Sequence, residues 1–131
     1  MTRDKVFDVY VAIPYTHPSL AMKKYRFEVA NLYTAWLFRQ GVWAFSPIGH
    51  SHPLGPYDVG TGWSDWEAFD LHLIDNCKEV HVLMLPGWRE SHGVQDEVKY
   101  AMAEGVPVRY ITVEQLDELA KDHDEAQKQR T

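Results

Sequence analysis

The sequence has little cysteine, little positive charge and no long apolar run. Cys77 is the single cysteine among 131 residues, so no internal disulfide can form and a reducing compartment is expected. The formal net charge of −6 at pH 7 argues against a protein that binds nucleic acid duplexes, because such proteins carry a basic face. The apolar start of the chain is short and is broken by Asp8, which argues against a signal peptide and a membrane span. We therefore expect a cytoplasmic protein that binds neither a membrane nor a duplex.

The composition is that of one globular domain. Hydrophobic residues make up 45% of the chain and charged residues 24%, which is close to the average for folded proteins. A chain of 131 residues is long enough to bury a sizeable core. We expect a single domain over residues 1–131, in which residues 115–131 form a polar C-terminal helix or tail.

Apolar segments alternate with amphipathic segments along the chain. β-Branched and aromatic residues predict strands, and apolar side chains at helical spacing predict the helices between them. The Gly-, Pro- and His-rich segment 48–62 is expected to be irregular, and a loop of that length tends to act as a lid or a binding loop. The expected strands cover residues 6–13, 42–46, 80–86 and 106–111, and the expected helices cover residues 20–40, 63–77, part of 88–105 and 112–131.

This alternation predicts an α/β fold with three layers, similar to the flavodoxin and Rossmann folds. Right-handed crossovers between strands give a mostly parallel sheet, here of four to five strands, with helices on both faces. In such sheets the ligand binds beyond the carboxyl ends of the strands. Those ends lead into the polar segments "PYTHPS", "SPIGHSH" and "PGWRESHG", which is where we expect the functional site.

The helical spacing also predicts which side chains are buried. In the first helix we expect an inward stripe of Phe27, Ala30, Thr34, Leu37 and Phe38. In the second we expect Trp66, Phe69, Leu73 and Ile74 to face inward. In the third, the inward residues are expected to be Val94, Val98, Ala101 and Met102.

Glu97 is the first candidate for chemistry. At about 100° per residue it lies beside the buried stripe, roughly 60° from Val94, near the N-terminus of its helix. The helix dipole at that end favours an ionised carboxylate, and the turn before it holds Ser91 and Gly93. An ionised, partly buried carboxylate aimed at the ligand end of the sheet has what a nucleophile requires. The alternative is an ordinary acidic residue that the dipole stabilises.

Asp70 is a candidate second carboxylate. It follows Phe69 and lies close to Leu73, which predicts a half-buried position. Cleavage at an anomeric carbon passes through an oxocarbenium-like state, in which one carboxylate captures the sugar and another acid protonates the leaving group or orients water. The alternative reading of Asp70 is a solvated helix residue.

The stretch "ESHGVQDEVKYA" resembles the nucleophile-bearing helix of the nucleoside 2-deoxyribosyltransferase superfamily. Ser91, Gly93, Glu97 and Ala101 fit the family pattern. The resemblance extends over most of the chain, including "FSP" with a histidine-containing loop and "CKEVHVLMLPGW". The superfamily includes transferases that exchange bases and hydrolases that cut the N-glycosidic bond of nucleoside 5′-monophosphates. The sequence is closest to a small branch with "LPGW…S.G…E" at this place.

The resemblance implies roles for four residues. Glu97 matches the nucleophile that attacks C1′ and forms a ribosyl-enzyme ester, and Asp70 matches the acid at the base or leaving group. Tyr15 matches an aromatic residue near the sugar. Ser91 matches the serine that the monophosphate hydrolases place against the 5′-phosphate, which favours a phosphorylated substrate.

The segment "IPYTHPS" departs from the family pattern. The hydrolases have a glycine-rich first loop around the phosphate, whereas this segment has no glycine. Thr16, His17 and Ser19 are the side chains that could donate hydrogen bonds in its place.

Other candidates come from the histidines and tryptophans. His50 is expected to touch substrate by resemblance, and Trp88, beside the Glu97 turn, is the tryptophan favoured for stacking on a base ahead of Trp63 and Trp66. No histidine pair has metal-ligand spacing on a rigid element, so no metal is expected. No cofactor is expected either, because the Glu97 carboxylate would do the covalent work. The remaining histidines and Cys77 are interpreted as follows: His52, His17 and His92 lie at the ligand end of the sheet, while His72, His81 and Cys77 are structural.

Two classes of function follow from these residues. The first is an enzyme that acts on the N-glycosidic bond of a small nucleotide or nucleoside, by hydrolysis or by base exchange. The second is a nucleotide-binding or sensor domain without turnover, because a fold does not fix a function. Cleavage of NAD-type dinucleotides is a third reading, which needs a roomier pocket. The resemblance also implies a homodimer or a larger homo-oligomer.

Overall fold

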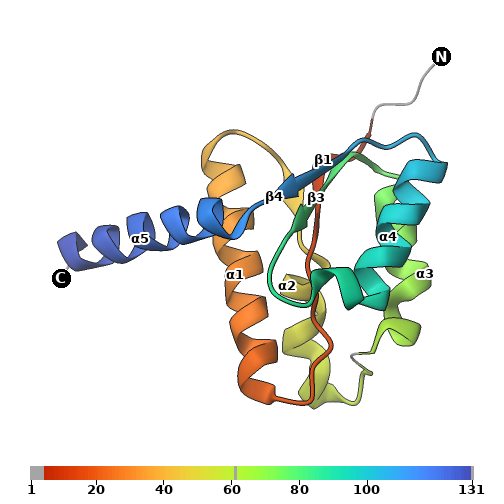
Figure 1. Ribbon diagram of the computed structural model, residues 1–131, viewed down its shortest axis with the longest axis horizontal. Coiled ribbons are helices and arrows are strands. Elements are labelled where there is room, and N and C mark those ends of the chain that lie inside the picture. The colour runs from red at the N-terminus through yellow and green to blue at the C-terminus, as the bar shows by residue number, and fades with distance from the viewer. Residues whose placement is uncertain (1–4, 61, 131) are drawn as a thin grey trace.

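The protein is described here from a computed structural model, for residues 5–60 and 62–130. Strands and helices alternate along this part of the chain (Figure 1). The elements are β1 (Phe7–Ala12), α1 (Leu20–Arg39), β2 (Ala44–Phe45), α2 (Pro47–Ser51), η1 (His52–Tyr57), α3 (Trp63–Ile74), β3 (Cys77–Leu83), η2 (Trp88–Glu90), α4 (His92–Ala103), β4 (Val108–Ile111) and α5 (Val113–Arg130).

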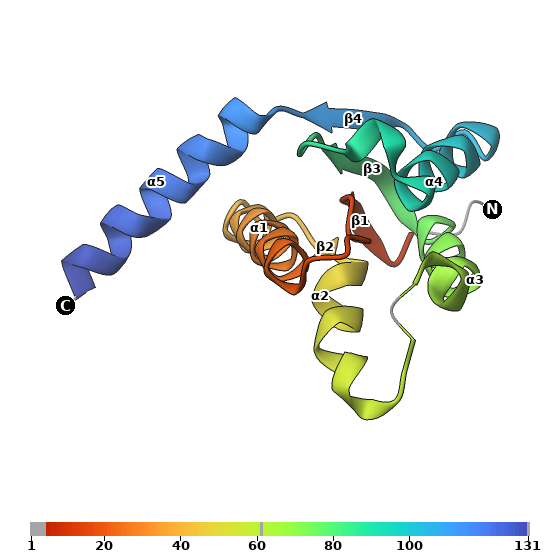
Figure 2. The ribbon, with the colours of Figure 1, turned by 60° about the horizontal axis from the view of Figure 1, so that its bottom comes forward.

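The four described strands form one parallel sheet in the order β2-β1-β3-β4. β1 and β3 are the central strands and pair from Phe7–Cys77 to Ala12–Val82, whereas β2 at the edge has only two residues. Helices cover both faces of the sheet, as Figure 2 shows. The predicted three-layer α/β fold is therefore confirmed, with the lower of the two expected strand numbers in the described residues.

The alternation of side chains along β1 separates two cores. Val9 and Val11 face α1 and α5, while Tyr10 and Ala12 face α3 and α4. All four side chains are at most 2% exposed. A central strand that is buried on both faces reads as a nearly continuous apolar run, which is why this strand is recognisable in the sequence.

The buried face of α1 is rotated from the predicted one. Phe38 is 54% exposed, so its predicted inward position is wrong, and Thr34 is only partly buried. Tyr33 faces the sheet instead, because its hydroxyl forms a hydrogen bond of 2.7 Å with Nδ1 of the buried His81. A prediction of buried positions from apolar residues alone misses Tyr33, because its hydroxyl finds a hydrogen-bond partner inside the protein. The buried residues of α1 are Arg26, Ala30, Tyr33 and Leu37.

The predicted inward faces of α3 and α4 are partly wrong for a related reason. Phe69 is 44% exposed and Met102 is 63% exposed. In their place each helix buries a carboxyl, Asp70 on α3 and Glu97 on α4. Each helix thus turns an acidic residue inward, toward the other helix and the sheet.

The expectation of irregular structure over residues 48–62 is wrong for residues up to 57. α2 begins where the Ser46 side chain accepts a hydrogen bond from the Gly49 backbone N–H at 3.1 Å, with Pro47 in the first helical position. Serine followed by proline is a favourable helix start, and η1 continues the chain with a second short helix.

The C-terminal segment forms the helix that its sequence predicts. α5 extends past α1 and away from α3 and α4 (Figure 1), and Leu116 is its buried residue. Within residues 5–60 and 62–130, no helix combines the length and the apolar content that crossing a membrane requires.

Candidate active site

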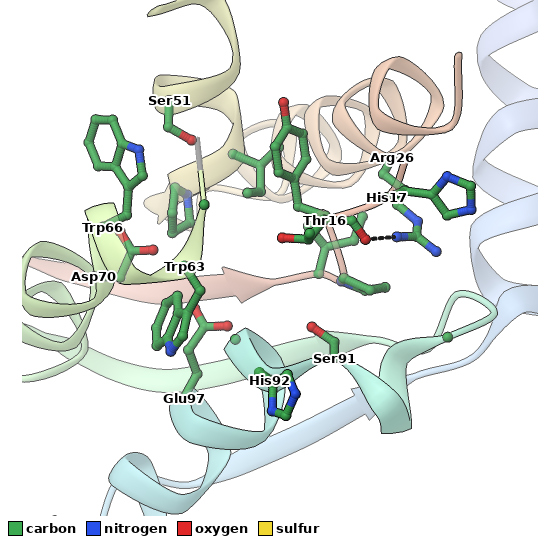
Figure 3. A pocket seen from close by; sticks show the side chains of 18 of the residues that line it. Thr16, His17, Arg26, Ser51, Trp63, Trp66, Asp70, Ser91, His92 and Glu97 are labelled. Carbon is green, nitrogen blue, oxygen red and sulfur yellow. Dashed lines mark hydrogen bonds between the residues drawn. The ribbon is translucent and has the colours of Figure 1, made fainter. Parts of the chain in front are cut away.

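A cavity of about 490 Å³ lies at the carboxyl ends of the central strands, where the sequence predicts the ligand site. Its walls come from the segments that follow β1, β2 and β3, and from α1, α3 and α4. Figure 3 shows two ends, with Ser91 and His92 between them. We call Trp63, Trp66, Asp70 and Glu97 the acidic end, and Thr16, His17 and Arg26 the arginine end.

Glu97 is held at the acidic end by α4 and by the sheet. It lies on the second turn of α4 and is only 5% exposed. The Tyr10 hydroxyl, which comes from β1, donates a hydrogen bond to its Oε2. The carboxyl is therefore oriented by a group on a different element and borders a cavity at the same time.

The expectation that the helix dipole keeps Glu97 ionised is wrong in its direction. Burial raises the pKa of Glu97 well above its ordinary value, the hydrogen bond from Tyr10 lowers it, and the charges of Asp70 and Asp96 raise it further. The dipole acts mainly within the first turn, and Glu97 lies beyond that turn. Desolvation of the charged form therefore dominates.

Asp70 is the second carboxyl of the acidic end. It is 5% exposed, and its Oδ1 is buried without a hydrogen-bond partner in the described residues. Burial raises the pKa of Asp70 from 3.8 to about 7, although a hydrogen bond with Tyr10 lowers it. A carboxyl with such a pKa exists in both protonation states near neutral pH, as a general acid requires.

Tyr10 joins the two carboxyls and was not recognised in the sequence. It is fully buried, and burial together with the charge of Glu97 raises its pKa well above the ordinary value. Its hydroxyl therefore keeps its proton and acts as a donor. The available signal was the alternation of β1, which puts Asp8, Tyr10 and Ala12 on one face of an otherwise apolar strand.

Arg26 is the second functional candidate that sequence reasoning missed. It is 8% exposed, lines the cavity from α1, and is the one lysine or arginine among the described residues of the lining. Its guanidinium donates hydrogen bonds to the backbone carbonyls of Thr16 at 3.2 Å and Pro86 at 3.1 Å. Arg26 thus ties together the loops that follow β1 and β3, and brings a positive charge to a cavity that also holds three acidic residues.

The turn before α4 lies in the cavity wall. Ser91 is the N-cap of α4, and its hydroxyl oxygen accepts a hydrogen bond from the Val94 backbone N–H at 3.3 Å. The hydroxyl proton of Ser91 is not used in that bond. Gly93 lines the cavity beside it. Ser91, Gly93 and Glu97, which the sequence pattern groups together, are thus brought to one cavity.

The first loop also contributes to the lining. Tyr15 is buried, and its hydroxyl forms a hydrogen bond of 2.5 Å with Nδ1 of His52, whose ring stacks on Phe27 with centroids 4.3 Å apart. Thr16 is exposed at the rim and His17 is partly buried. The Nδ1 atom of His17 accepts a hydrogen bond from the Ser19 N–H at 2.9 Å, which fixes the ring orientation.

His50 and Trp88 do not line the cavity. His50 is exposed on α2 and stacks on Phe69 with centroids 5.8 Å apart, because the segment forms a helix that turns this ring outward. Trp88 packs on Tyr110 of β4, with ring centroids 5.5 Å apart, and is partly buried against the core that α3 and α4 form with the sheet. Trp63 and Trp66, which the sequence favours less than Trp88 for stacking on a base, line the cavity instead.

In the part of the chain that the structure describes, no three histidine, cysteine, aspartate or glutamate side chains come together in a way that could hold a metal ion. Among the described residues, the Asp70 and Glu97 carboxyls of the acidic end are not joined by a third potential metal ligand. The acidic side chains that line the cavity can supply acid, base and carboxylate chemistry.

A family model described as a domain of unknown function (DUF1937) matches residues 7–113, which includes every element from β1 to β4. No curated protein matches the sequence.

Proposed function

The chain belongs to the DUF1937 family, and for it we propose cleavage of the N-glycosidic bond of a nucleoside 5′-monophosphate, with Glu97 as the nucleophile. The observation that carries this proposal is the acidic end of the cavity. Two buried carboxyls, Glu97 and Asp70, flank one Tyr10 hydroxyl there. Paired carboxyls with different roles are what cleavage at an anomeric carbon uses. The Ser-Gly-Glu spacing of the deoxyribosyltransferase-like pattern supports the same assignment.

In the first step, a Glu97 carboxylate oxygen bonds to C1′ as the bond from C1′ to the base nitrogen breaks. Asp70, in its protonated form, gives its proton to the leaving base. The proposed reaction uses the form of the pair in which Glu97 is ionised and Asp70 holds a proton. The hydrogen bond that Tyr10 donates to Glu97 favours that form of Glu97 and acts against the effect of burial. The products of this step are the free base and a ribosyl ester of Glu97.

In the second step, water attacks C1′ of the ester. Asp70, now ionised, takes a proton from the water, and Glu97 leaves as a carboxylate. The sugar 5-phosphate is released, and both carboxyls return to their starting states. No cofactor enters either step, because the Glu97 carboxylate supplies the covalent chemistry.

The arginine end suits the 5′-phosphate. Arg26 contributes the positive charge, the Ser91 hydroxyl has a proton to donate, and Thr16 and His17 add polar groups at the rim. These side chains take the place of the glycine-rich loop that is missing from "IPYTHPS". With a phosphate at this end and a base at the acidic end, the sugar would lie between them, near Ser91 and His92 and within reach of Glu97 on the side of the base; Figure 3 shows how these side chains lie.

The first prediction concerns the substrate. We expect free base to appear from nucleoside 5′-monophosphates at least about tenfold faster than from the matching nucleosides, because only the monophosphates engage Arg26 and Ser91. The measurement is chromatography after incubation with adenine, guanine, cytosine and uracil nucleosides, each with and without the 5′-phosphate and in ribose and deoxyribose forms.

Two other outcomes would replace the hydrolase. New nucleosides that appear only when a second base is added would show a base-exchanging transferase. Binding of monophosphates without any release of base would show a nucleotide-binding domain.

The second prediction concerns Tyr10. Tyr10→Phe should lower kcat/KM by about tenfold or more, because a hydrogen bond to a charged group is lost. In the wild type the hydrogen bond from Tyr10 lowers the pKa of Glu97. Tyr10→Phe removes this bond, so the pKa of Glu97 should rise further and the acidic limb of the pH–rate profile should move to higher pH. Tyr57→Phe, at a side chain that is 75% exposed, is the control. An acidic limb that stays in place would argue against contact between Tyr10 and the ionised nucleophile.

A further inference from the structure

We propose that α2, α3 and α4 form a base-recognition subsite at the acidic end, in which Trp63 stacks on the base and the Ser51 hydroxyl bonds to its edge. The ligand class is a planar heteroaromatic ring with hydrogen-bonding groups on its rim. This inference rests on the proposed function, because it assigns the part of the cavity that faces the leaving group.

Trp63 is held in place before any ligand arrives. Its indole Nε1 donates a hydrogen bond of 2.8 Å to Asp96 on α4. The same ring lies against Gly93, where a side-chain Cβ would stand only 3.3 Å from Trp63 Cε3. The ring therefore has two supports on α4, although it belongs to α3. An aromatic ring that is already fixed loses little conformational freedom when a base stacks on it.

The position of Trp63 explains why residue 93 is a glycine. Even an alanine Cβ would press on the indole, so the glycine lets Trp63 lie close to the start of α4. The same turn that leads to Glu97 therefore also positions the ring. Stacking and bond cleavage are then fixed relative to each other by one short stretch of α4.

Ser51 supplies a polar group for the rim of the base. It is the last residue of α2 and is 5% exposed, and Figure 3 shows its hydroxyl turned toward the cavity. Within residues 5–60 and 62–130 this hydroxyl has no hydrogen-bond partner. The hydroxyl is therefore free to bond to a ligand in the cavity, and a base that covers it without such a bond would leave it unpaired.

The neighbouring polar groups leave this role to Ser51. The Trp66 indole Nε1 donates to the Gly60 carbonyl at 2.6 Å and is therefore occupied. Asp70, whose buried Oδ1 has no partner among the described residues, is already assigned to the proton transfer in the proposed reaction. Ser51, which can both donate and accept, is left to contact the distal edge of the ring.

The experiment compares ligands with and without a base. Binding is measured by calorimetry in the Glu97→Gln background, which prevents turnover, with adenosine, guanosine, cytidine and uridine 5′-monophosphates and with ribose 5-phosphate. Trp63→Leu should weaken the binding of all four monophosphates by about tenfold to a hundredfold, as expected for loss of a stacked aromatic ring. Ser51→Ala should weaken the preferred monophosphate by about five- to tenfold and reduce discrimination among the bases. Ribose 5-phosphate should bind equally to all variants.

Two matched substitutions serve as controls. Trp43→Leu removes a tryptophan that is 64% exposed and outside the cavity, and Ser64→Ala removes an exposed serine of α3. Neither should change any of the affinities. Circular dichroism of each variant checks that it folds.

Several results would overturn the subsite. An equal loss of affinity for ribose 5-phosphate would make Trp63 a structural wall, and unchanged base selectivity in Ser51→Ala would remove Ser51 from recognition. Failure of all four monophosphates to bind would reject the subsite as a whole. Failure of the proposed function is a separate result, because it appears as normal binding to the wild type without release of base.

Discussion

Glu97→Gln is expected to lower the rate of base release by at least about 10³-fold, while the Kd for a nucleoside 5′-monophosphate changes by less than about threefold. The amide has nearly the shape of the carboxyl and keeps an oxygen that accepts the Tyr10 hydrogen bond. It does not form a ribosyl ester, so the covalent step is lost and ground-state binding is retained. The measurements are single-turnover rates by chromatography and Kd by calorimetry.

The control for this substitution is Glu104→Gln, at an exposed residue just after α4. It changes the net charge by the same amount and should leave rate and affinity unchanged. A Glu97→Gln variant that retains more than about a tenth of the wild-type rate would exclude Glu97 as the nucleophile. In that case the acidic end of the cavity would act through Asp70 and water.

Asp70→Asn is expected to make the protein more stable at alkaline pH and nearly inactive. Burial raises the pKa of Asp70 to about 7 in the folded protein, above its ordinary value of 3.8. The folded state therefore binds more protons than the unfolded state, and wild-type stability falls as pH rises between these two values. Asparagine has no charge to desolvate, so the variant should gain on the order of 4 kcal/mol above pH 7, and the gain should shrink toward pH 4. Urea unfolding at several pH values measures this difference.

The activity of the same variant should fall by about a hundredfold or more, because asparagine has no proton to transfer to the leaving base. Glu67→Gln, at an exposed residue of α3, is the control for both measurements. Parallel stability curves for Asp70→Asn and the wild type across this pH range would show that Asp70 has an ordinary pKa. Retained activity would assign leaving-group protonation to another residue.

These two predictions express one physical point about the acidic end. The proposed reactivity of Asp70 and Glu97 depends on their burial, which also makes their charged forms unfavourable in the folded protein. Stability and reactivity are therefore opposed at these two positions. Replacement by the neutral amide separates the two effects, since it removes the charge and keeps the shape.

The parallel α/β fold could be predicted from the sequence, because strands and helices leave local, periodic patterns of apolar residues. β1 and β3 are buried on both faces and read as apolar runs, and the helices between them force parallel connections. The helical phase of α4 also placed Glu97 beside Val94 on the inward side. The turn residues Ser91 and Gly93 were found through their fixed spacing to Glu97.

Tyr10 and Arg26 could not be found in the same way. Both are polar residues in positions that an apolar pattern fills, and their meaning depends on partners 87 and 60 residues away in the sequence. The local sequence pattern does not show which buried polar groups form hydrogen bonds with each other. The outward position of His50 was missed for another reason, since it depends on α2, a short helix started by Ser46 and Pro47 in a segment that reads as a loop.

The acidic end and the arginine end are held by parts of the protein that should differ in how easily they unfold locally. Tyr10 lies on β1, which has a neighbouring strand on each side, and donates a hydrogen bond to Glu97. The acidic end is therefore attached to a segment whose amide hydrogens should exchange only through global unfolding. Arg26 instead holds two surface loops through their carbonyl oxygens. Local opening is therefore expected at the arginine end, while the contact between Tyr10 and Glu97 at the acidic end stays in place.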